Sequence, residues 1–346
     1  MSACKTLFCA SLSSFKCTPY PSPRSLSLSL SSLLHHLPHA GLKFTSRCYT
    51  SAQSATSLEA IEEDQPNDTV RDLLTKHEGV SRLMKMERKP LLLEGEFSES
   101  EPQARWFPYL DRYRCENGYL MSSGEIIGAV SPCISDVRQE RFRNVVRNRS
   151  YSVCLVVEGL CDFGNVSAAF RSADALGVQS VHVVSFDANK RYKDNRHVSM
   201  GAEKWLDIEL WDSTKECFKI LKSRGYRIAT THVGMDAVSI YDLDWSCPTA
   251  IVVGNENRGI SDEALELSDL HCSIPMNGMV DSFNVSVAAG ILMHHAVCDR
   301  VSRMGHHGDL TVEESQILLA EFSLRHSQSA ISIVQDYAQR KAAILS

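Results

Sequence analysis

The feature that most constrains the fold is a regular alternation of apolar runs and helical patterns between residues 135 and 300. The apolar runs are continuous, which is typical of strands buried on both faces of a sheet. They lie at 152–160, 180–186, 227–233, 249–255 and 270–276. Helical patterns lie at 135–150, 165–177, 213–225, 261–268 and 283–299. The alternation predicts an α/β fold with a mainly parallel sheet flanked by helices.

Polar residues and glycines or prolines follow three of the predicted strands, at 158–165, 254–261 and 274–284. In parallel sheets, ligands bind beyond the carboxyl ends of the strands. The three segments therefore predict one site built from three loops.

The first segment continues into "NVSAAFRSADALG", residues 165–177. Asn165 stands where a helix N-cap is expected, and capping alone would explain it. Arg171 is isolated among Ala, Phe and Ser, so its guanidinium needs a phosphate or a carboxylate as partner. The sequence leaves a functional and a structural role for Arg171 equally open.

The second segment is "GNENRGIS", residues 254–261. It lacks the lysine of a P-loop, and its glycine spacing differs from that of a dinucleotide-binding loop. A plain strand–turn–helix connection would explain Gly254 and Gly259 but would not explain Glu256 between them.

The third segment is "IPMNGMVDSFNVSVAA", residues 274–289, in which polar residues precede an uncharged small-residue helix. Together and in order, the three segments resemble the motifs of the SpoU/TrmH branch of the SPOUT RNA 2′-O-ribose methyltransferases. The resemblance covers about residues 136–300, and the helical tail resembles the TrmH tRNA (guanosine-2′-O)-methyltransferases. It implies a carboxyl-terminal deep trefoil knot, a rare exception to unknotted topology.

The resemblance also implies a reaction. It is methyl transfer from S-adenosyl-L-methionine to a ribose 2′-hydroxyl of RNA, with a guanosine in tRNA as the favoured target. Ribosomal RNA as the target, and a non-catalytic RNA-binding protein with the same fold, are the alternatives. Such proteins act as homodimers and need no metal, because the methyl donor is already activated.

The family's functional residues carry over by position. Arg171 matches the catalytic arginine, supported by Asn165, Glu256, Ser282 and Asn284. The positions that match cofactor-binding residues are Thr231, Gly254, Ile274, Met276 and Phe283.

RNA capture requires a local basic surface, because the body of the protein is acidic. Residues 59–346 contain 31 Lys and Arg against 42 Asp and Glu, a net charge of −11. This balance disfavours non-specific coating of nucleic acid. We expect RNA to contact the helix at 135–150 through Arg138, Arg141, Arg143, Arg147 and Arg149, together with a mobile basic loop at 190–197. A merely solvated face is the alternative.

The first 58 residues contain 14 Ser, five basic residues and no Asp or Glu. This composition predicts an organelle transit peptide, and the excess of Ser over Arg favours chloroplast over mitochondrion. A disordered tail is the alternative. Residues 59–135 are expected to be a linker and amino-terminal extension, partly disordered. The methyltransferase domain is expected at 136–300 and a helical extension at 301–346.

The 12 cysteines are scattered, and none forms a C-x-x-C pair. This pattern suits a reducing compartment and predicts neither disulfides nor a structural metal. No apolar stretch is long enough to predict a membrane span.

Overall fold

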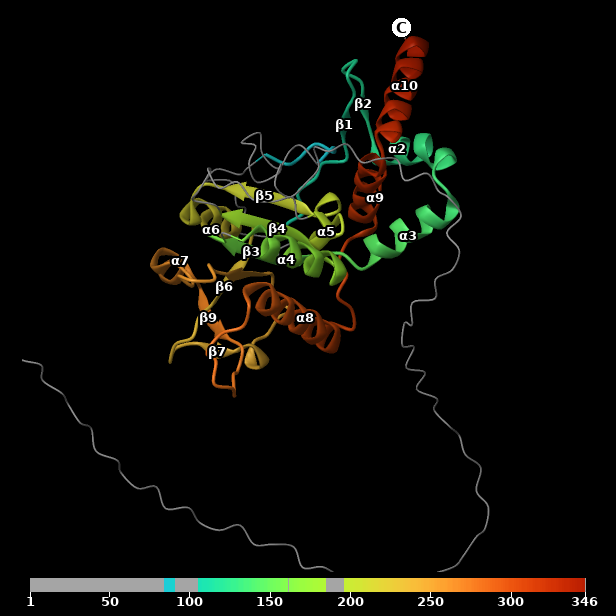
Figure 1. Cartoon of the computed structure of the whole chain (residues 1–346). Coiled ribbons are helices and arrows are strands. Elements are labelled where there is room, and N and C mark those ends of the chain that lie inside the picture. Colours follow the sequence, from blue (N-terminus) through green and yellow to red (C-terminus); the bar gives the residue numbers. More distant parts are fainter. Residues whose placement is uncertain (1–83, 91–104, 161, 185–195, 346) are drawn as a thin grey trace, which may run out of the picture. The chain divides into compact units, whose positions relative to one another are not determined.

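A computed structural model describes residues 84–90, 105–160, 162–184 and 196–345 (Figure 1). These residues belong to one compact unit, Leu58–Ser346. The predicted transit peptide and nearly all of the basic loop at 190–197 lie outside the described residues.

The predicted parallel α/β sheet is confirmed. Seven strands pair in the order β5-β4-β3-β8-β6-β9-β7, and all of these pairings are parallel. Five were predicted: β3 (Ser150–Glu158), β4 (Val178–Val184), β6 (Arg227–Thr231), β8 (Thr249–Val253) and β9 (Leu270–Ser273). Two were not, β5 (Asp207–Trp211) and β7 (Val238–Ser239). The trefoil knot stays a prediction from the resemblance.

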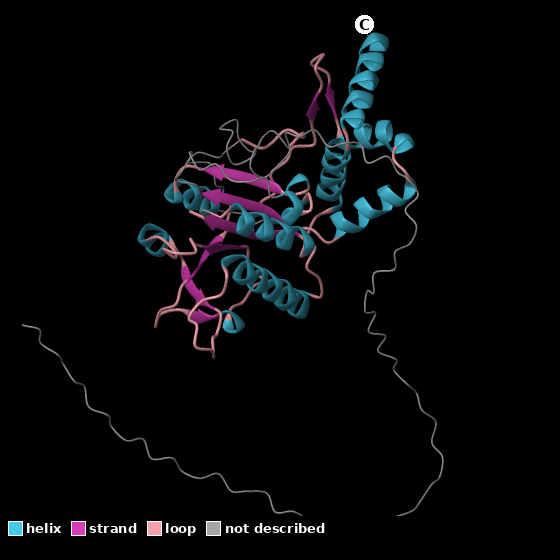
Figure 2. Cartoon of the chain, viewed as in Figure 1, coloured by secondary structure: helices cyan, strands magenta, loops and turns pink. Residues whose placement is uncertain are grey.

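Helices cover both faces of this sheet (Figure 2). One face packs against α4 (Phe163–Ala175) and α8 (Val285–Met304), and the other packs against α6 (Thr214–Ser223) and α7 (Asp262–Leu267). Successive side chains of a strand point to opposite faces. Strand β3 accordingly sends Leu155 into the first core and Val156 into the second. This is why its sequence is apolar at every position from 153 to 157.

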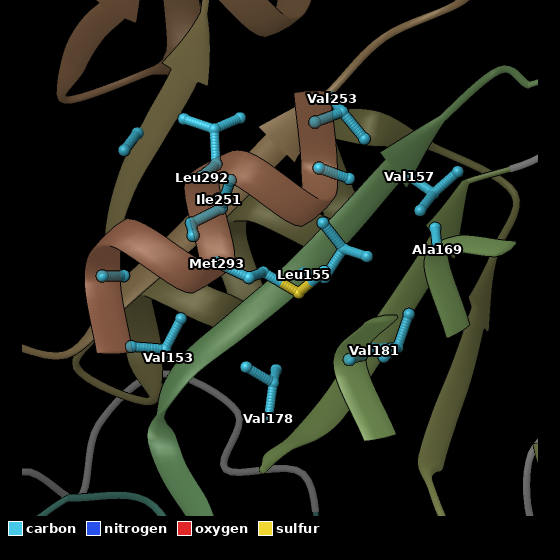
Figure 3. Close-up of a cluster of buried hydrophobic side chains, with 14 of the residues drawn as sticks. Val153, Leu155, Val157, Ala169, Val178, Val181, Ile251, Val253, Leu292 and Met293 are labelled. Atoms are coloured by element: carbon cyan, nitrogen blue, oxygen red, sulfur yellow. The ribbon is translucent and has the colours of Figure 1, made fainter. Parts of the chain in front are cut away.

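Small residues allow α4 and α8 to pack closely against each other. Ala173 of α4 and Ala289 of α8 are fully buried. A Cβ added at Gly290 would lie 3.7 Å from Ser172 Oγ of α4. Figure 3 shows Met293 of α8 beside Leu155 of β3. The uncharged, small-residue start of α8 is therefore a packing requirement.

A second core lies beside the sheet and joins both ends of the described chain. It contains residues of β1 (Tyr113–Arg114), β2 (Leu120–Met121), α2 (Ser123–Val130), α3 (Asp136–Arg147), α9 (Val312–His326) and α10 (Gln328–Leu345). Phe107 and Tyr109 are also buried in it. The described part of the extension before residue 136 is therefore packed structure rather than a linker, and it shares a core with the carboxyl-terminal helices. The remaining elements are α5 (Arg196–Ser199) and short 3-10 turns at Ser131–Cys133, Ala202–Lys204 and Ile240–Asp242.

A buried charge network ties this second core to the sheet edge. The Arg325 guanidinium lies 2.8 Å from the Asp207 carboxylate of β5 and 2.6 Å from Glu321. Glu321 also accepts hydrogen bonds from the backbone N–H groups of Lys85 and Met86, at 2.8 and 2.6 Å. Burial and the Asp207 charge raise the pKa of Tyr109, whose hydroxyl donates to Asp207, well above its ordinary value. Asp207 thus has a structural reason to interrupt an otherwise apolar edge strand.

Within the described residues, no helix is long and apolar enough to cross a membrane. The same part of the chain contains no group of three or more His, Cys, Asp or Glu side chains placed to hold a metal ion. The described cysteines are free thiols.

Candidate functional site

Four neighbouring strands end at the same edge of the sheet. The parallel register places Val157 of β3 beside Val253 of β8, and Thr231 of β6 beside Cys272 of β9. The loops that leave this edge carry the three sequence motifs. The sheet therefore brings together segments that are far apart along the chain.

Three polar side chains, one from each motif, form a hydrogen-bonded chain at this edge. Asn165 Nδ2 donates to Glu256 Oε1 at 3.0 Å, and Asn284 Nδ2 donates to Asn165 Oδ1 at 3.0 Å. Asn165 thus uses both ends of its amide to link a carboxylate to a second amide. We call Asn165, Glu256 and Asn284 the polar triad.

Asn165 does not cap α4, which corrects the capping interpretation. The cap is Asp162, whose Oδ1 accepts from Gly164 N at 2.7 Å, and Asn165 lies within the first turn. The helix begins earlier than expected because Asp162 supplies the capping oxygen. The Asn165 amide is consequently available to the polar triad.

Asn284 is a helix cap as well as a triad member. Its Oδ1 accepts from Ser286 N at 3.0 Å and from Ser286 Oγ at 2.6 Å, at the start of α8. With the oxygen used by the helix, the amide nitrogen is directed to Asn165. One side chain therefore both starts α8 and anchors it to α4.

Arg171 lies on α4 six residues after Asn165 and is exposed. Among the described residues, it makes no ion pair or hydrogen bond. The structural interpretation, in which a carboxylate partner explains Arg171, is therefore not supported. Ser282 is also exposed, and it has no hydrogen-bond partner in the described part of the chain. The structure thus brings Asn165, Glu256 and Asn284 together but does not join Arg171 or Ser282 to them.

The five candidate cofactor residues lie at or beyond the same strand ends. Thr231 ends β6, Gly254 follows β8, Ile274 and Met276 follow β9, and Phe283 precedes α8. All but Phe283 are half-buried, and the Phe283 side chain is 42% exposed. Backbone groups and apolar side chains dominate this set.

Gly254 is required by the turn that carries Glu256. A Cβ there would lie 2.5 Å from Gly259 O, a contact that real Cβ atoms do not make. Asn255 and Gly259 exchange two backbone hydrogen bonds across this turn, at 2.9 and 2.8 Å. Gly259 has a φ of +73°, which also favours glycine. The plain-turn interpretation therefore explains both glycines, and Glu256 remains as the residue with a separate role.

The five candidate RNA-binding arginines divide into exposed, half-buried and buried members. Arg141, Arg143 and Arg147 are exposed, and Arg138 is half-buried. The expected RNA contact of Arg149 is corrected: its side chain is 1% exposed and ion-paired with Asp174 of α4. Arg149 lies beyond the end of α3, where the chain enters β3, and therefore points into the fold.

Sequence reasoning missed two residues that hold the Glu256 turn, Asn255 and Glu158. Asn255 adjoins Glu256 within the motif but has no distinctive pattern of its own. Glu158 is a single acidic residue at the end of an apolar strand, and it is 2% exposed. A single carboxylate in an otherwise apolar strand needs hydrogen-bond donors, and this requirement is the sequence signal that could have identified Glu158.

Comparison with known proteins identifies the family. The model of the SpoU rRNA Methylase family matches residues 152–294. The chain is 32% identical over 191 residues to the tRNA (guanosine(18)-2′-O)-methyltransferase of Aquifex aeolicus, a match covering 55% of this chain and 90% of that protein. Identity to the protein of the same name from Thermus thermophilus is 34% over 167 residues, covering 48% of this chain and 85% of that protein.

A 23S rRNA (guanosine-2′-O-)-methyltransferase of Pseudomonas aeruginosa is 31% identical over 177 residues, covering 51% of this chain and 70% of that protein. A crystal structure of an A. aeolicus TrmH/SpoU tRNA modifying enzyme aligns with a TM-score of 0.49 and 33% identity, over 53% of this chain and 93% of that chain. The fold and the polar triad define an α/β protein with a polar site at the carboxyl edge of its sheet. The extent of the sequence match then places it: the chain belongs to the SpoU methylase family.

Proposed function

We propose that this protein transfers a methyl group from S-adenosyl-L-methionine to the 2′-hydroxyl of a guanosine ribose in tRNA. The observation that carries the proposal is the polar triad, because it joins the three family motifs through matching donors and acceptors, and one of its members shares α4 with Arg171. The names of the Aquifex and Thermus relatives support tRNA as the substrate.

The residues at the strand ends fit the cofactor. S-adenosylmethionine combines a flat adenine ring with polar ribose and amino-acid groups, so it needs both apolar surface and backbone groups. Ile274, Met276 and Phe283 offer the apolar side chains, and the glycine-containing turn at Gly254 offers backbone groups at the same edge of the sheet. We assign cofactor contacts to these four residues and to Thr231. When bound, the cofactor supplies a methyl group that is already activated on a sulfonium.

The remaining task for the protein is to help the ribose hydroxyl act as a nucleophile. As the new carbon–oxygen bond forms and the carbon–sulfur bond breaks, the hydroxyl proton must leave. An arginine guanidinium stays protonated at neutral pH, so Arg171 is a poor base. It instead binds a phosphate next to the ribose and stabilises the negative charge that develops on the 2′-oxygen, while an RNA phosphate takes the proton.

The polar triad and Ser282 position the reacting groups in this scheme. Asn165 is fixed on one side by Glu256 and on the other by Asn284, so the helix that carries Arg171 is held against both other loops. Ser282, next to Phe283, is exposed and available to the ribose or the cofactor. Holding reactants in line in this way supplies a large part of the rate enhancement of a bimolecular reaction.

Ribosomal RNA is the second candidate substrate, and the Pseudomonas relative favours it. Assays with both tRNA and ribosomal RNA separate the two. A protein that binds S-adenosylmethionine and RNA but methylates neither would support the non-catalytic alternative.

We expect Arg171→Ala to lower kcat for RNA methylation by about 100-fold or more, the scale of losing one donor to a developing anion. The dissociation constant for S-adenosylhomocysteine should change by less than about threefold, because Arg171 acts on the RNA side. Radiolabelled methyl transfer and calorimetry measure the two quantities. Arg340→Ala, which removes an exposed arginine from α10, is the control. An Arg171→Ala protein with wild-type kcat refutes the role.

We propose that the exposed arginines of α3 contact RNA phosphates. The groove beside α3 has a volume of about 900 Å³ and includes Arg141 but also Asp136, Glu140 and Asp174, so the contact depends on few cations. Replacing Arg141, Arg143 and Arg147 by Ala should weaken RNA binding. The slope of the logarithm of the association constant against the logarithm of the salt concentration should fall by about one per lost phosphate contact. Fluorescence anisotropy at several salt concentrations measures this. Replacing Lys215, Lys219 and Lys222 on α6 by Ala removes the same charge elsewhere, and equal effects of the two triple variants would contradict the proposal.

We propose that the protein is a homodimer that uses the exposed face of α8. Val287 and Val301 are 48% and 45% exposed, and they lie on the same side of α8 because the intervening residues span about four helical turns. Exposed apolar side chains on one side of a helix favour association. Sedimentation equilibrium should give twice the 38.5 kDa chain mass, and Val287→Asp should shift it to one chain mass. Val312→Asp, at a more exposed valine of α9 (85% exposed), should leave the mass unchanged. A wild-type protein that sediments as a monomer excludes this interface.

We propose that residues 1–58 direct the protein to the chloroplast. The support is compositional, since the segment is rich in Ser and free of acidic residues. Fused to a fluorescent protein, the segment should be imported by isolated chloroplasts and shortened there. Import by mitochondria alone would instead support the other organelle, and import by neither would reject a transit function.

A further inference from the structure

The turn that carries Glu256 is attached to the end of β3 at two points, one on each side of Glu256. Before Glu256, Asn255 Nδ2 donates to Gly159 O at 2.7 Å. After it, Ser261 donates to Glu158, with Ser261 Oγ 2.6 Å from Oε1 and Ser261 N 3.0 Å from Oε2. Glu158 and Gly159 are consecutive residues at the start of the segment 158–165, which leads to Asn165 and α4. The turn is therefore fixed to the segment that leads into α4.

The Asn255 side chain organises the turn as well as anchoring it. Its Oδ1 accepts from Asn257 N and from Arg258 N, both at 2.9 Å. One amide thus binds the two backbone N–H groups that follow Glu256 and the carbonyl that follows β3. Both ends of the amide have a fixed partner, so its orientation is determined. An acid or an aliphatic residue cannot make this set of bonds.

The partner atom of Asn255 is itself held in place. Gly159 N donates to Val184 O at the end of β4, at 2.9 Å, and Gly159 has a φ of +62°. Glu158 is 2% exposed and also accepts from Thr214 Oγ1 at 2.7 Å. A buried carboxylate with three donors is a rigid attachment point, because breaking any of these bonds leaves a buried charge poorly satisfied.

We propose that Asn255 is a positioning residue for the methyl transfer reaction. It acts through Glu256: by fixing the turn to Gly159, it holds the Glu256 carboxylate 3.0 Å from Asn165 and thereby aligns the helix that carries Arg171. This inference rests on the proposed function of the site. The second attachment, Glu158 with Ser261, keeps the turn folded when Asn255 is changed, so the role of Asn255 can be tested in a folded protein.

Asn255→Asp is the sharpest test. A carboxylate still accepts from Asn257 N and Arg258 N, but it cannot donate to Gly159 O and it repels that oxygen. We expect kcat to fall by about 10- to 100-fold, the scale of a small displacement of a reacting group. The dissociation constant for S-adenosylhomocysteine and the urea midpoint should stay close to those of the wild type. Asn257→Asp, the same chemical change two residues away, should leave kcat unchanged.

A double-mutant cycle with Glu256→Ala, which removes the acceptor for Asn165, separates positioning from a general structural effect. If Asn255 acts through Glu256, the double variant has the kcat of Glu256→Ala alone. A double variant in which the losses of the two single variants add would overturn the proposal, and so would a wild-type kcat in Asn255→Asp.

A crystal structure of Asn255→Asp provides a readout that does not depend on activity. The hydrogen bond between Glu256 and Asn165 should be lost or lengthened beyond bonding distance. If that bond is retained, the positioning role is wrong even in an active enzyme. If the wild type methylates no RNA while the bond is lost in the variant, the proposed function fails and the structural role of Asn255 stands.

Discussion

The site depends on the parallel pairing of β3, β8, β6 and β9. Because these strands run in the same direction and in register, their carboxyl ends lie level, with Val157 beside Val253 and Thr231 beside Cys272. Leu155 of β3 fits into one close-packed core and Val156 into the other, so a shift of one residue would exchange side chains of different size between the cores, and packing fixes the register. The same packing therefore determines where the three loops begin, and the polar triad follows from burial on both faces of the sheet.

The residue types in the triad follow from hydrogen-bond chemistry. A carboxylate only accepts, so Glu256 requires a donor, and Asn165 supplies one while keeping an acceptor for the next partner. Asn284 has its oxygen occupied at the start of α8 and therefore offers its amide hydrogens. Replacing one triad residue by a side chain with different donors and acceptors leaves a neighbouring triad residue without its hydrogen-bond partner. In the triad, Glu256 accepts, Asn165 both donates and accepts, and Asn284 donates. Each member comes from a different motif.

Much of the fold could be predicted from the sequence because burial leaves a strong pattern. Strand β3 is apolar on both faces, and the three polar loops follow strand ends. The edge strand β5 escaped prediction because Asp207 and Glu209 interrupt it, and only the distant partners Arg325 and Arg224 explain these charges. Asn165 was placed at a helix cap because Asp162, three residues earlier, gave no stronger signal. Ion pairs between residues far apart in the sequence, and the choice between two possible helix caps, leave no periodic pattern. A reading of local sequence patterns therefore misses them.

The free state of Arg171 follows from the competition for one carboxylate. Asp174 lies three residues further along α4, a spacing at which Arg and Asp side chains commonly pair. Asp174 is instead paired with Arg149, which is buried. Breaking that pair would leave a buried charge without a partner, which is strongly destabilising. Among the described residues, Arg171 is thereby left without a counter-ion on a protein of net negative charge. Because no carboxylate in the described part of the chain pairs with this arginine, a phosphate can bind there without breaking an ion pair among those residues.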